Sequence, residues 1–111
     1  MTVRVLLADR EGAARRALAG ALQDIDGVEL AGEVGDRAEL AHALRATQSE
    51  VLVIDDRLLR GMEAELPALR VLVLGVDDDP AFAARAKRLG AEAWIAKDQA
   101  DEQLELLLKA S

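Results

Sequence analysis

Short runs of aliphatic and β-branched residues recur along this chain, separated by intervals that each hold about one helix. The runs cover residues 3–8, 28–34, 51–54, 71–74 and 93–96. Continuous apolar runs of this length are typical of strands that are covered on both faces. Strands that alternate with helices through short connections therefore predict a parallel sheet with helices on both sides.

Helical signals occupy the intervals between these runs. Asp36 and Glu39 have the spacing of a capping box, and Asp79 before Pro80 is typical of a helix cap followed by the first helical position. Gly90 is expected to close the helix that Pro80 opens. The predicted helices cover residues 12–22, 36–46, 62–66, 80–90 and 101–109.

The third predicted helix is short, because Val71 comes only sixteen residues after Asp55 and a strand and loops must fit there as well. The predicted fold class is α/β, with a single flavodoxin-like, doubly wound sheet of five parallel strands and five helices. The commonest strand order for such a sheet is 2-1-3-4-5. In that order the crevice lies between the first and third strands, at their carboxyl ends.

Composition indicates one soluble domain. The chain has 111 residues, of which 51% are apolar, and a formal charge of −7. This charge argues against direct binding to nucleic acid or to an anionic membrane, since both need clustered cations. The chain has no cysteine, shows no signal peptide and has no apolar stretch of roughly 18 residues that could span a bilayer. We therefore expect a cytoplasmic protein.

Three charged residues follow predicted strands: Asp9, Asp55 and Lys97. Because the carboxyl ends of parallel strands face one crevice, two carboxylates and one ammonium group are expected to meet there. Each residue also has a purely structural interpretation. Either aspartate could cap the segment that follows it, and the lysine could be solvated. Their joint placement favours a functional pocket.

Four segments, residues 3–9, 51–55, 70–74 and 89–98, resemble the receiver (CheY-like) domain of bacterial response regulators. The resemblance is greatest to the NarL/FixJ subclass and extends over nearly the whole chain. It implies that residues 1–111 form one receiver domain without the output domain. The implied partners are a histidine kinase and, only through an output domain outside this chain, DNA. No enzymatic activity of its own and no membrane contact are expected.

The resemblance also assigns roles within the crevice. Asp55 matches the aspartate that accepts a phosphoryl group, and Lys97 matches the lysine that pairs with it. Magnesium in the family is held by the acceptor, by an acidic pair after the first strand, and by the backbone carbonyl that would belong to Arg57. An aromatic residue on the fifth strand takes part in the switch, and Trp94 has that position.

The sequence departs from the family pattern inside this pocket. Arg10 replaces the second acid of the pair after Asp9, and Gly75 stands where the switch hydroxyl is expected. The loop that begins at Asp56 lacks the usual Met-Pro-Gly. Only a vestigial metal set remains, formed by Asp9, Asp55 and the carbonyl of Arg57, so we expect no metal ion or other cofactor. The expected pocket residues are Asp9, Arg10, Asp55, Asp56, Arg57, Gly75 and Lys97.

The charges of the pocket predict a receiver with little or no magnesium-dependent phosphorylation. Asp9 and Asp55 are balanced by Arg10 and Lys97 without any ion. A guanidinium can fork onto a carboxylate, so an Arg10–Asp55 ion pair is expected to hold one state. Losing a carboxylate and gaining a cation should weaken a site for Mg²⁺, which prefers oxygen ligands.

Three hypotheses of function follow. The first is an atypical receiver that controls an attached or partner output, with transcription as the expected process, through dimerisation or partner binding. The second is a conventional receiver that is phosphorylated on Asp55, with magnesium as its cofactor. The third is a sensor in which Arg10 and Lys97 bind an acidic small molecule. For the expected homodimer, the candidate contacts are Leu106 and pairing of Arg15 and Arg16 with Glu102 and Glu105.

Overall fold

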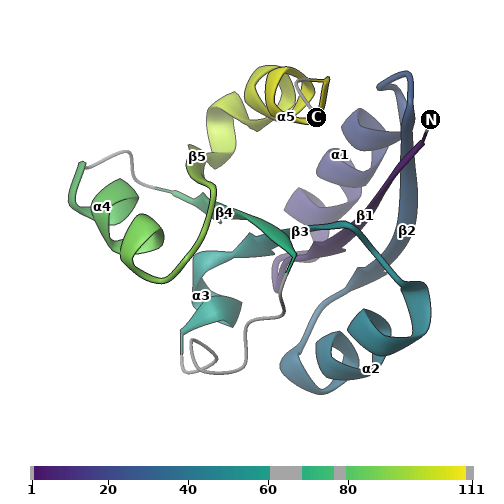
Figure 1. Ribbon diagram of the computed structural model, residues 1–111, viewed down its shortest axis with the longest axis horizontal. Helices are drawn as coiled ribbons and strands as arrows, with labels where there is room; N and C mark the ends of the chain where they lie inside the picture. Colours follow the sequence, from purple (N-terminus) through teal and green to yellow (C-terminus); the bar gives the residue numbers. More distant parts are fainter. Residues whose placement is uncertain (1, 61–68, 77–79, 110–111) are drawn as a thin grey trace.

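The computed structural model describes residues 2–60, 69–76 and 80–109. Its five strands form one parallel sheet in the order β2-β1-β3-β4-β5, which confirms the predicted topology (Figure 1). The helix predicted over 62–66 and the cap predicted at Asp79 lie outside the described residues. Within the described part of the chain, no helix has the length and apolar character needed to cross a bilayer.

Most predicted elements begin and end within a residue or two of the observed ones. The strands are β1 (Val3–Ala8), β2 (Val28–Val34), β3 (Val51–Asp55), β4 (Arg70–Gly75) and β5 (Ala93–Ala96). The helices are α1 (Gly12–Gln23), α2 (Arg37–Thr47), α3 (Asp56–Leu59), α4 (Pro80–Arg88) and α5 (Ala100–Lys109), with a 3₁₀ turn η2 (Lys97–Gln99) before α5. The short helix α3 follows β3 without a loop.

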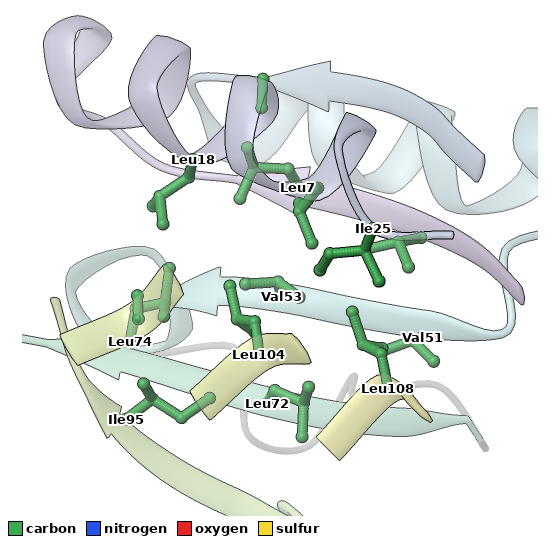
Figure 2. Close-up of a cluster of buried hydrophobic side chains, with 14 residues drawn as sticks. Leu7, Leu18, Ile25, Val51, Val53, Leu72, Leu74, Ile95, Leu104 and Leu108 are labelled. Atoms are coloured by element: carbon green, nitrogen blue, oxygen red, sulfur yellow. The ribbon is translucent and has the colours of Figure 1, made fainter. Parts of the chain in front are cut away.

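Helices cover both faces of the sheet. Figure 1 shows α1 and α5 on one side and α2, α3 and α4 on the other. Neighbouring residues of a strand point to opposite faces, so Leu7 packs under α1 and α5 while Leu6 packs on the other side. Figure 2 shows the α1/α5 side, where Leu18, Leu104 and Leu108 meet the side chains of the strands. The central strand β3 is buried along its whole length.

Local hydrogen bonds fix the ends of the helices beside the crevice. The Asp36 carboxylate accepts a bond from the Glu39 amide at 2.8 Å, as predicted for an N-cap. The Glu39 carboxylate returns to the amide of Gly35 rather than that of Asp36, so the capping box is displaced by one residue. Arg37 donates to the carbonyl groups of Leu58 and Arg60, which ties α2 to the end of α3.

The register of the sheet brings the predicted strand-end residues to one edge. Asp55 lies opposite Leu74, and Gly75 lies opposite Ala96. Asp9 directly follows the last residue of β1, and Lys97 directly follows β5. The crevice at the carboxyl end of the sheet is therefore formed by four different strands.

Candidate functional site

Lys97 joins the two aspartates of the crevice. Its Nζ lies 2.9 Å from Oδ2 of Asp9 and 3.8 Å from Oδ2 of Asp55. Both aspartates are buried, and the lysine side chain is only 16% exposed. The structure thus brings together the three charged residues that the sequence singled out, although they belong to three separate strand ends.

The two aspartates also bind the backbone that follows them. Oδ1 of Asp9 accepts a hydrogen bond from the amide of Glu11 at 2.9 Å, and Oδ1 of Asp55 accepts one from Arg57 at 3.2 Å. Each aspartate therefore caps the segment that follows it and also lies in the crevice beside Lys97. One oxygen of each carboxylate fixes its own loop, while Lys97 lies near both oxygens of Asp9 and near Oδ2 of Asp55.

The second oxygen of Asp9 is the least satisfied polar atom of the crevice. Oδ2 is buried and has no hydrogen-bond partner among the described residues. The Lys97 ammonium is close to it but donates its hydrogen bond to Oδ1, at 3.1 Å. We therefore treat the contact with Oδ2 as an ion pair without a directed hydrogen bond. This buried oxygen is therefore compensated by the charge of Lys97 and by no directed hydrogen bond among the described residues.

The expected ion pair between Arg10 and Asp55 is not formed. Arg10 is exposed and makes no hydrogen bond or ion pair with any residue that the structure describes. The carboxylate of Asp55 faces Lys97 instead. Arg10 lies in an exposed loop after β1 and keeps its charge hydrated, whereas Lys97 follows β5 and reaches both buried carboxylates. The third hypothesis, in which Arg10 and Lys97 bind an acidic small molecule, stays a prediction.

Asp56 has partners that sequence reasoning missed. Oδ2 of this buried carboxylate accepts from Nε of Arg60 at 3.1 Å and lies 3.0 Å from its Nη2. Oδ1 lies 3.5 Å from Nη1 of Arg85, which comes from α4. The i, i+4 spacing of Asp56 and Arg60 was a usable signal, but the contact with α4 is visible only in three dimensions.

The charges of the crevice are balanced in a different way from the one predicted. Three buried carboxylates, those of Asp9, Asp55 and Asp56, contact three cations within the described residues. Lys97 contacts Asp9 and Asp55, while Arg60 and Arg85 contact Asp56. Electrical balance is reached without Arg10.

Trp94 fills the space beside Gly75. A β-carbon added to Gly75 would lie 1.9 Å from Cζ2 and 2.2 Å from Cη2 of the indole ring. The ring also stacks on Phe82 of α4, with centroids 5.2 Å apart and an interplanar angle of 14°. A hollow of about 240 Å³ opens beside this stack and is lined by Asp55, Asp56, Arg57, Arg60, Gly75, Val76, Phe82 and Trp94.

The residues of the crevice make an incomplete site for magnesium. Asp9 and Asp55 offer carboxylate oxygens, but Lys97 already contacts both of them. The carboxylate of Asp56 is turned to two arginines. Among the described residues, no three acidic, histidine or cysteine side chains are grouped as metal ligands. Magnesium favours several oxygen ligands in octahedral geometry, so this set does not fit a resident ion.

Comparison with known proteins identifies the fold. The sequence matches no family model and no curated protein. The structure is similar to the RcsB response regulator of Salmonella typhimurium, with 24% identity and a TM-score of 0.85 over 98% of this chain and 59% of that one. The chain thus spans less than two thirds of that protein.

Isolated receiver domains match over most of both chains. The non-phosphorylated receiver domain of the stress response regulator RcsB from Escherichia coli has 23% identity and a TM-score of 0.85 over 99% of this chain and 92% of that one. The signal receiver domain of a response regulator designated NarL from Mycobacterium tuberculosis has 24% identity and a TM-score of 0.83 over 98% and 94%. The chain therefore has the fold of response-regulator receiver domains.

Proposed function

We propose that this domain is a signal-transduction receiver of an atypical response regulator, in which magnesium-dependent phosphorylation of Asp55 is weak or lost. The observation that carries the proposal is the contact of Lys97 with both Asp9 and Asp55 at the carboxyl end of a receiver-type sheet. The domain is not expected to be an enzyme in its own right, because these residues provide no pair of nucleophile and base.

The charges of the crevice support the weak binding of magnesium. An ion would have to compete with Lys97 for two carboxylates, and it would lie near the exposed cation of Arg10. The loop position that Arg10 holds has no acidic side chain to offer. Both effects reduce the affinity of a small, strongly hydrated dication.

The test introduces an acidic side chain at position 10, where Arg10 replaces the second acid of the pair after β1. In the wild type, Mg²⁺ should leave the fluorescence of Trp94 unchanged at sub-millimolar concentration. Arg10→Asp adds a third carboxylate beside Asp9 and should give saturable quenching, because Trp94 borders the hollow at Asp55. Trp94 is the sole tryptophan, so the signal has one source.

Arg16→Asp is the matched control. It makes the same change of charge at an exposed residue of α1 and should leave the magnesium titration flat. Saturable quenching in the wild type at sub-millimolar Mg²⁺ would contradict the proposal.

A conventional receiver is the second candidate function, and the exposed position of Arg10 favours it. Since this side chain does not pair with Asp55, the buried acceptor carboxylate lines the hollow without that cation beside it. Incubation with acetyl phosphate and magnesium, followed by intact-mass measurement, separates the two candidates. A phosphorylated species that is absent from Asp55→Asn would favour conventional phosphorylation, for which a histidine kinase would be the natural donor.

The output is proposed to depend on homodimerisation or on a partner in the cytoplasm, with any DNA contact made through an attached or partner output domain. Arg15 is less suited to the α1–α5 contact than the sequence indicates, because it donates to the carbonyl of Asp9. Leu106 on α5 is 71% exposed and supports a contact there. Light scattering after gel filtration should show a dimer that Leu106→Ser weakens and the control Val76→Ser leaves intact.

A further inference from the structure

The crevice cannot communicate with α4 through a side chain at position 75. Gly75 offers none, and the indole of Trp94 occupies the space that a β-carbon would need. Trp94 in turn stacks on Phe82 of α4. An apolar stack of this kind has no charge through which a change at the Asp55 carboxylate could act directly.

Asp56 offers a different connection. It directly follows Asp55, and its buried carboxylate contacts Arg60 of the segment after α3 and Arg85 of α4. Asp56 is thus a charged group that lies one residue from the acceptor position and is also an ion-pair partner of α4. Arg85 comes from the same short helix as Phe82, so a shift of α4 alters the surroundings of Trp94.

We propose that Asp56 and Arg85 are positioning residues that link the charge state of Asp55 to the placement of α4. Two neighbouring carboxylates repel each other, so the charge on Asp55 changes the free energy of the cations around Asp56. Any added negative charge at Asp55 attracts Arg60 and Arg85, whose guanidinium groups fork readily onto anions. The inference rests on the proposed function, since it assumes that Asp55 is the input of a receiver.

A double-mutant cycle tests the link without magnesium or a phosphoryl donor. Asp55→Asn removes one charge and should shift the emission of Trp94 and the amide exchange of α4. In the Arg85→Gln background, Asp55→Asn should produce only a small part of the shift in Trp94 emission and of the change in amide exchange of α4. Coupling of this kind is expected only if the two residues interact, here through Asp56, which follows Asp55 in the chain and contacts Arg85.

Two further variants separate a positioning role from loss of structure. Arg88→Gln removes an exposed cation from the same helix and should leave the effect of Asp55→Asn unchanged. Arg85→Lys keeps the positive charge but cannot donate two parallel hydrogen bonds to one carboxylate. Compared with Arg85→Gln, it should restore part of the coupling between positions 55 and 85. If circular dichroism shows that Arg85→Gln unfolds, Arg85→Met, which keeps the apolar stem of the side chain but removes the charge, replaces it in the cycle.

The outcomes are distinct from those of the magnesium titration. Full shifts in the Arg85→Gln background, or no shift of α4 after Asp55→Asn in the wild type, would overturn the link between Asp56, Arg85 and Asp55. Neither result depends on whether the domain binds magnesium or accepts a phosphoryl group, so the proposed function stands or falls on its own test.

Discussion

The charged clusters at the two ends of the sheet differ in burial and in how completely they are hydrogen-bonded. At the amino end, Arg70 forms a fork with both oxygens of Glu92, at 2.7 and 2.6 Å, and donates to the carbonyl of Leu107. Arg4 similarly binds Glu29 and the carbonyl of Thr47. These groups lie at the surface and are well hydrogen-bonded, so they hold the ends of strands and helices together.

The carboxyl end has the opposite arrangement. Its carboxylates are buried, one oxygen of Asp9 has no hydrogen bond among the described residues, and Lys97 is shared between two acids. Buried charges are costly unless they are fully paired. The contrast indicates that the amino end is built for stability, while the carboxyl end retains an arrangement whose cost fits a functional site.

The largest expected effect comes from removing the shared cation. Lys97→Met leaves Asp9 and Asp55 buried without a counter-charge and should lower the free energy of unfolding by roughly 3 kcal/mol. Urea denaturation followed by circular dichroism measures the loss. Lys109→Met breaks a solvent-exposed pair with Glu105 and should leave the midpoint nearly unchanged. If Lys97→Met and Lys109→Met lowered the free energy of unfolding equally, the buried ion pairs of the crevice would matter no more to stability than an exposed pair.

A smaller effect is expected at the indole contact. Gly75→Ala forces Trp94 from its place, and overpacking of this kind should cost about 2 kcal/mol. The clashing atoms belong to the six-membered ring of the indole, so Trp94→Phe should relieve most of the cost of Gly75→Ala. Thermal or urea unfolding of the two single variants and the double variant gives the coupling. Additive losses would show that the contact is not tight.

The smallest effect is expected at the amino end and depends on pH. The hydrogen bond from Arg70 lowers the pKa of Glu92, and burial opposes this only in part. A lowered pKa in the folded state means that the pair stabilises the protein above the ordinary pKa of glutamate. The contribution is lost as the pH falls through the folded value.

Glu92→Gln should therefore reduce stability by about 0.5 kcal/mol at neutral pH, as is usual for a partly solvated pair. The difference from the wild type should vanish in acid, below the lowered pKa of Glu92. Urea midpoints measured across this range test it, with the exposed Glu102→Gln as the control. A difference that persists in acid would mean that packing, not charge, holds this end together.

The architecture was predictable because its signals are local. The apolar run at residues 51–54 is typical of a covered strand, and strand–helix alternation restricts the topology to few orders. The same logic brought Asp9, Asp55 and Lys97 to one crevice, since residues at the carboxyl ends of parallel strands share an edge. The extent of most elements, and the cap at Asp36, follow from residues close in sequence, but the sequence placed Asp56 in a loop where the structure begins α3.

What the tertiary structure decided is where each side chain finds its partner. The sequence predicted that Arg10 would neutralise Asp55, yet Arg10 is exposed. The partners of Asp56 are Arg60, which follows α3, and Arg85 of α4. Local patterns determine backbone conformation through sterics and hydrophobic burial. Ion pairs and ring contacts depend on distances between segments far apart in the chain, and those distances exist only once the helices are packed on the sheet.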